Sequence, residues 1–111
     1  MDDPIFFKDY SASVIFRPDR YGKATLFENE YLMAGLNCLE PGQMMEKHAH
    51  EIQTRLYLVL EGEAHLRVDD QEQVVSQGTV AWVPPGHTHR IANEGSQRLI
   101  MLVGIAPTHS D

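Results

Sequence analysis

The chain has little cysteine, little positive charge and no long apolar run, and each shortage excludes a class of protein. Its 111 residues hold one cysteine, Cys38, which cannot form an internal disulfide, so nothing indicates an oxidising compartment. Nine Lys and Arg against 16 Asp and Glu give a net charge of −7, which disfavours nucleic acid or an anionic membrane as a partner. No apolar run approaches the roughly 18–20 residues that cross a bilayer. The acidic start, Met1-Asp2-Asp3-Pro4, lacks the basic region of a signal peptide, so we expect a cytoplasmic protein.

What the sequence does have is the composition of one globular domain built from short strands. Hydrophobic residues make up 42% and charged residues 23%, which excludes a disordered or fibrous chain. After a mixed first part, with residues 11–16 interpreted as extended and 17–22 as a turn or loop, Gly, Pro and Asp turn signals recur at roughly 8–12-residue spacing. The strands expected between them cover residues 31–39, 43–50, 56–60, 64–68, 73–76, 80–83, 89–93 and 98–105. No sustained helical periodicity follows residue 31, and the pattern predicts an all-β sandwich or barrel.

The chemistry of the sequence lies in its histidines. His48 and His50 are two residues apart, so on a strand their side chains face the same way. Neutral imidazoles at that spacing chelate divalent cations. His89, which follows Pro84-Pro85-Gly86, would join them from another strand. The His-x-His spacing alone is common and carries little weight.

Two longer motifs give these histidines a context. Gly42, five residues, His48-Ala49-His50 and then Tyr57 to Gly62 resemble the first motif of the cupin superfamily. Gly78, five residues, Pro84-Pro85-Gly86-His87-Thr88-His89, three residues and Asn93 match the second cupin motif at every defined position. The two motifs stand in the right order, and the resemblance covers about residues 31–105.

The resemblance implies a fold, a metal and an assembly. The fold is a small β-barrel, a jelly-roll-type double-stranded β-helix, over residues 31–105, with a tail over 106–111. His48, His50 and His89 resemble metal ligands for one divalent ion per chain, and iron, manganese, nickel, copper and zinc all suit imidazole. Single-domain cupins often pair, so we expect a homodimer in which the N-terminal extension, residues 1–30, provides a dimerisation strand.

One ligand of the cupin pattern is missing. Cupins usually supply a glutamate four or five residues after the second histidine, where this chain has Thr54 and Arg55. A guanidinium has no lone pair for a metal, and about 5 Å from a dication it would be repelled by roughly 6–7 kcal/mol at an effective dielectric near 20. Arg55 must therefore point away from a metal or hold an anion beside it. We favour Gln53 as the fourth ligand, with Glu46 or water as alternatives.

Two functions follow from this site. The first is a small metal-dependent enzyme, an oxygenase such as a dioxygenase or an isomerase, that acts on a small oxygenated or enolisable substrate. Glu46, Arg55 and Tyr57 are its candidate catalytic residues. The second is a metal-stabilised module that binds a small molecule without turning it over, and an inert barrel is a third, weaker hypothesis. The fold alone does not choose among them.

Overall fold

The computed structural model describes residues 4–49 and 52–108. Those residues form nine strands and one short 3-10 helix, and no α-helix. The elements are η1 Tyr10–Ser13, β1 Gly22–Glu28, β2 Met33–Leu39, β3 Met44–Lys47, β4 Thr54–Glu61, β5 Glu63–Val68, β6 Gln71–Ser76, β7 Val80–Val83, β8 His89–Ala92 and β9 Leu99–Ala106. In the part of the chain described, no helix is long and apolar enough to span a membrane.

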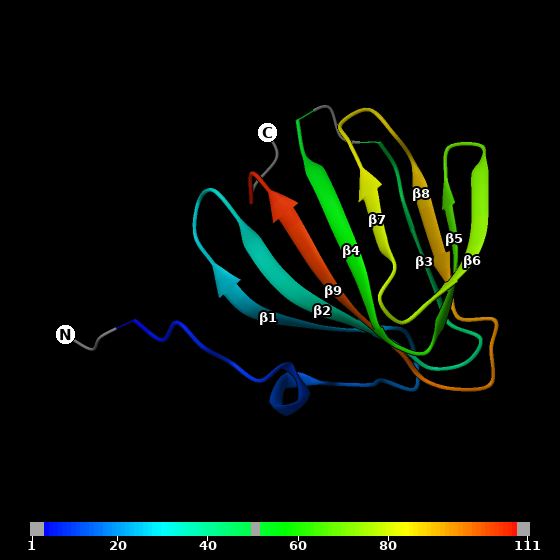
Figure 1. Cartoon of the computed structure of the whole chain (residues 1–111), viewed down its shortest axis with the longest axis horizontal. Coiled ribbons are helices and arrows are strands. Elements are labelled where there is room, and N and C mark those ends of the chain that lie inside the picture. The colour runs from blue at the N-terminus through cyan, green and yellow to red at the C-terminus, as the bar shows by residue number, and fades with distance from the viewer. Residues whose placement is uncertain (1–3, 50–51, 109–111) are drawn as a thin grey trace.

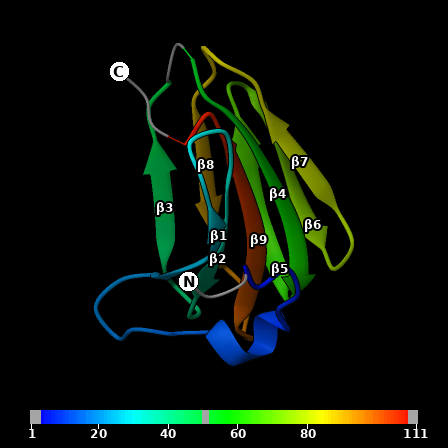
Figure 2. The same ribbon diagram turned by 90° about the vertical axis from the view of Figure 1, so that its left-hand side faces the viewer.

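The strands form two antiparallel sheets that face each other as two layers (Figures 1 and 2). One sheet has the order β1-β2-β9-β4-β7 and the other the order β3-β8-β5-β6. This arrangement confirms the predicted all-β, jelly-roll-type fold. All eight expected strands are present, but β3 ends at Lys47, whereas the sequence predicts a strand through residue 50.

The main core lies between the two sheets. Alternation along β4 places Tyr57 and Val59, both 1% exposed, on the inner face, while Leu56 on the outer face is 50% exposed. Ile91 of β8 and Met101 of β9 belong to the same buried cluster. Burying such apolar side chains is the main source of the stability of the fold.

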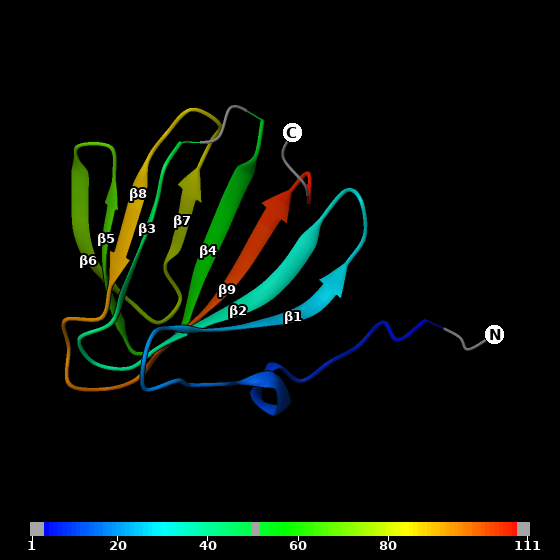
Figure 3. The same cartoon turned by 180° about the vertical axis from the view of Figure 1, so that it is seen from behind.

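A second cluster lies on the outer face of the five-stranded sheet. Its buried members are Leu26, Leu36, Cys38 and Ile100, and the N-terminal segment covers them with Tyr10, Val14 and Phe16. Figure 3 shows this segment passing along β1 and β2 on the outside of the sheet. Burial raises the pKa of the Cys38 thiol, which fits a packing role for that residue.

The N-terminal part differs in detail from the sequence prediction. A 3-10 turn, η1, with Asp9 at its N-cap, occupies part of the segment 11–16 for which the sequence predicts an extended conformation. The sequence does not predict β1, because the run Gly-Lys-Ala-Thr-Leu-Phe-Glu shows no clear alternation. It forms a strand because β2 offers a partner, in the register Lys23↔Asn37.

Candidate functional site

One end of the barrel brings together most of the residues that the sequence singled out. We call it the mouth: the end where β3 stops at Lys47, β4 starts at Thr54 and β8 starts at His89. The pairing of β3 with β8 sets Lys47 directly opposite His89. Residues directly opposite each other in a sheet share a face, so these two side chains are neighbours.

His89 and Tyr57 form the buried centre of the mouth. Their side chains are 4% and 1% exposed, and the Tyr57 hydroxyl lies 2.7 Å from Nε2 of His89. Burial raises the pKa of Tyr57, while hydrogen bonding by the Arg55 guanidinium lowers it. Tyr57 is therefore a neutral phenol near neutral pH, and the tautomer of His89 decides which of the two groups donates the hydrogen bond. The ring of His89 is held in one orientation by this contact.

Gln53 connects the mouth to the end of the last strand. Its amide nitrogen donates to the carbonyl oxygens of Pro107 and Thr108, each at 3.1 Å, and the side chain is buried. Its amide oxygen accepts a hydrogen bond of 3.1 Å from Nη2 of Arg55. The amide thus ties residues 107–108 to β4 and orients Arg55. Its predicted role as a metal ligand stays a prediction.

Two of the remaining predicted site residues, His48 and Glu46, border a cavity that His89 also lines. His48 is exposed and borders this shallow cavity of about 210 Å³, which Asp69 also lines. The Glu46 carboxylate forms an ion pair of 3.5 Å with Arg90 on the sheet surface. His50 lies outside the described residues.

The side chains at the mouth include the type of ligand that divalent metals bind. His48 and His89 come from neighbouring strand ends and border one cavity, and imidazole nitrogen is a good ligand for first-row metals. Residues 4–49 and 52–108 by themselves contain no group of three His, Cys, Asp or Glu placed to hold a metal. A three-histidine centre therefore needs His50 and belongs to the proposal below.

The comparison with known proteins decides the family. A family model described as a cupin domain matches residues 35–105. The chain belongs to the cupin family. The resemblance of the two sequence motifs to the cupin superfamily is thereby confirmed.

Three relatives show how far the likeness extends. This cupin is 33% identical to the protein TT1209 of Thermus thermophilus, with a TM-score of 0.87 over 91% of this chain and 96% of that one. It is 26% identical to a Thermotoga maritima protein described as a predicted oxalate decarboxylase, with a TM-score of 0.72 over 77% and 78% of the two chains. An uncharacterised Methanocaldococcus jannaschii protein is 30% identical over 63 residues, 57% of this chain and half of that protein.

The cupin has an interior cavity at the mouth that the sequence did not predict. It has a volume of about 180 Å³. Lys23, Lys47 and Arg55 border it together with Asn37 and several apolar side chains. These cations come from β1, β3 and β4, so the pairing of distant strands brings them together, and no local sequence pattern reveals the cluster.

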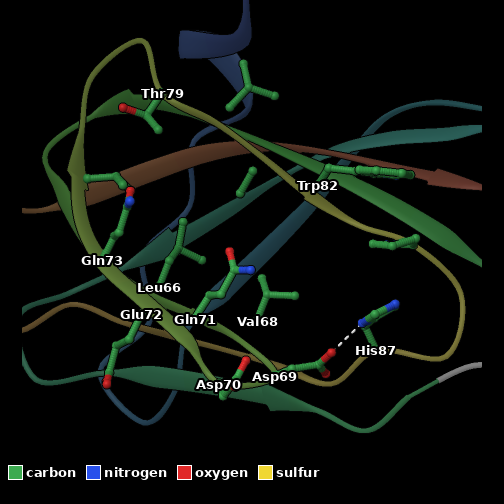
Figure 4. Close-up of a pocket in the computed structure, with 14 residues that line it drawn as sticks. Leu66, Val68, Asp69, Asp70, Gln71, Glu72, Gln73, Thr79, Trp82 and His87 are labelled. Carbon is green, nitrogen blue, oxygen red and sulfur yellow. Dashed lines mark hydrogen bonds and ion pairs between the residues drawn. The ribbon is translucent and has the colours of Figure 1, made fainter.

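A larger groove of about 600 Å³ lies between β6 and β7, at the neighbouring edges of the two sheets (Figure 4). His87 forms a hydrogen bond with Asp69 at one end, and this contact lowers the pKa of the Asp69 carboxyl. Trp82 is 63% exposed beside the groove, and its indole nitrogen donates to Thr54 Oγ1 at 3.0 Å. The Asp69 carboxylate thus holds the side chain of His87, which lies in the turn before β8.

Proposed function

We propose that this cupin is a small metal-dependent enzyme that acts on a small oxygenated or enolisable compound. The metal would be held by His48, His50 and His89 at the mouth. The observation that carries the proposal is the buried His89 ring, fixed by the Tyr57 hydroxyl at 2.7 Å. A metal-ligating histidine typically donates its other ring N–H to a hydrogen-bond acceptor, and the Tyr57 oxygen would take that role for Nε2–H of a His89 that binds the metal through Nδ1.

The residues around His89 have separate tasks in this proposal. A bound divalent ion would supply Lewis acidity, polarising an oxygen of the substrate. Tyr57 orients His89 and keeps its own proton near neutral pH, because its pKa is raised by burial. Arg55, oriented by Gln53, presents a fixed positive charge to the substrate. Glu46 would supply a base only after leaving its ion pair with Arg90.

The description of one relative supports an enzyme. The Thermotoga maritima relative is described as a predicted oxalate decarboxylase. A cytoplasmic location and a homodimer, both expected from the sequence, form part of the same proposal.

Elemental analysis of protein purified without an affinity tag or chelator tests the metal centre. We expect about one iron, manganese, nickel, copper or zinc ion per chain, because the three histidines provide one site. His50→Ala and His89→Ala should lose this metal. His65→Ala is the matched control, because His65 is a partly exposed histidine that pairs with Glu72 and Glu94 away from the mouth. Full metal occupancy in His89→Ala protein would contradict the ligand set.

Two further variants separate the roles of the neighbouring residues. Arg55→Ala should keep its metal, because a guanidinium is not a ligand. Gln53→Ala distinguishes a ligand from a structural amide: metal bound as tightly as in the parent protein means that Gln53 only ties down residues 107–108.

The second candidate function is a cupin that binds a small molecule without turning it over. The cations around the interior cavity favour it, since three positive charges provide binding energy without any chemistry. Metal-loaded protein incubated with thiols, diketones and flavonols distinguishes the two. Oxygen uptake or product formation supports the enzyme, and ligand binding without turnover supports the binding protein.

A further inference from the structure

We infer that the interior cavity at the mouth binds the carboxylate of a short-chain organic acid, and that Lys23, Lys47 and Arg55 recognise its charge. The inference rests on the proposed function, because it names the class of substrate for that same site. It goes beyond the proposed function in assigning an anion-binding role to residues outside the histidine set.

The charge around the cavity is the first argument. The chain carries nine Lys and Arg, and three of them border this one cavity although the net charge is −7. No Asp or Glu is among the described residues that line it. Lys23, Lys47 and Arg55 also have no ion pair with any carboxylate in residues 4–49 and 52–108. Unpaired cations around a partly enclosed space attract an anion more strongly than they would in open water.

Asn37 provides an independent argument. Its side chain is only 4% exposed and lines the cavity, yet its amide makes no hydrogen bond with any described residue. The polar atoms of this amide are open to the cavity and not sealed within the core, so its N–H groups are available to a bound ligand. Lys23 stands directly opposite Asn37 in the β1–β2 pairing, so the amide and a cation share one face. Together they present N–H donors to a single anion.

Arg55 is prepared for a carboxylate. The Gln53 amide oxygen accepts from one of its nitrogens at 3.1 Å and so limits the rotation of the guanidinium. A planar guanidinium pairs with a carboxylate through parallel hydrogen bonds, and a group held in place loses less entropy on binding.

Size and lining define the rest of the ligand. A cavity of about 180 Å³ has the volume of about six water molecules at about 30 Å³ each. Met33, Met45, Val103 and Ile105 form an apolar part of its wall. A ligand with a carboxylate at one end and a short carbon chain at the other satisfies both parts, whereas inorganic phosphate leaves the apolar wall without a partner.

Isothermal titration calorimetry with butyrate, butyramide and inorganic phosphate tests the inference on metal-loaded and on chelator-stripped protein. We expect butyrate to bind both forms, and butyramide, its neutral counterpart, to bind at least about tenfold more weakly, because a charge-assisted hydrogen bond is worth at least that factor. Lys47→Met and Arg55→Gln should each weaken butyrate binding by about tenfold or more. Arg20→Gln, which removes one positive charge at an exposed position outside the cavity, should change it by less than about twofold.

Each result separates this inference from the proposed function. Butyrate binding to stripped protein that takes up no metal supports the inference and contradicts the metal centre. Metal binding without butyrate binding supports the metal centre and contradicts the inference. The role of the cations is overturned if butyrate and butyramide bind with equal affinity. It is also overturned if Arg20→Gln and Lys47→Met lose equal amounts of butyrate affinity. Phosphate binding tighter than butyrate overturns the carboxylate assignment. If Lys47→Met fails to fold, Lys23→Met gives the same test at an exposed residue.

Discussion

Removing the Tyr57 hydroxyl tests whether the centre of the mouth is a hydrogen-bonded network. Tyr57→Phe keeps the ring and its packing and deletes one oxygen, which lies 2.7 Å from Nε2 of His89. The hydroxyl is fully enclosed, because Tyr57 is 1% exposed, so water cannot replace it. The substitution leaves Nε2 of His89 without this partner.

The magnitude follows from that loss. A buried ring nitrogen left without its hydrogen-bond partner costs about 2 kcal/mol in the free energy of unfolding. For a chain of about 110 residues, 1 kcal/mol corresponds to about 4 °C in Tm, so we expect a decrease of about 8 °C.

Urea and thermal unfolding followed by far-ultraviolet circular dichroism measure this change. Metal-stripped protein at one fixed concentration keeps ligand and assembly effects out of the comparison. Tyr31→Phe is the matched control: Tyr31 is 73% exposed, and its hydroxyl makes no hydrogen bond within the described residues. It should shift the free energy by less than about 0.5 kcal/mol. A Tyr57→Phe protein as stable as the control would refute the network.

Three further predictions concern other parts of the fold. Hydrogen bonding to Glu94 raises the pKa of His65 above 6.5. The stabilising effect of the protonated ring is therefore present below that pH and disappears as the pH rises through the raised pKa. The free energies of unfolding of His65→Gln and of the parent protein should differ at pH 5.5 and converge at pH 9. Gly62→Ala should lower the free energy of unfolding by about 3 kcal/mol or more, because φ is +86° and the new Cβ would collide with the Arg98 carbonyl. Gly42→Ala has a similar φ of +91° but open space around the new Cβ, so it should lower that free energy by only about 1–2 kcal/mol in the same urea titration. Phe7, 91% exposed in the N-terminal segment, should contribute to the proposed homodimer. Light scattering after size exclusion should then show Phe7→Ser shifted towards monomer relative to the parent protein, and an unchanged dimer would exclude this role.

The sequence by itself determined the fold class and the positions along the chain of eight of the nine strands that the described residues form. Alternating and apolar stretches such as residues 64–68, closed by turns such as Asp69-Asp70, depend only on neighbours in the chain. The turn appears between β5 and β6, and Asp69 has a φ of 53° there. The spacing of the second cupin motif also located His89 at the start of a strand, since the turn residues before it are local signals.

Only the tertiary structure decided what surrounds that histidine. β1 becomes a strand through its pairing with β2, which a weak local pattern does not reveal. Gln53 bonds to Pro107 and Thr108, more than fifty positions away, and Lys23, Lys47 and Arg55 meet at one cavity from three different strands. These contacts depend on which strands lie side by side and on which face each residue points, and pairing between distant segments is not encoded in any short window of sequence.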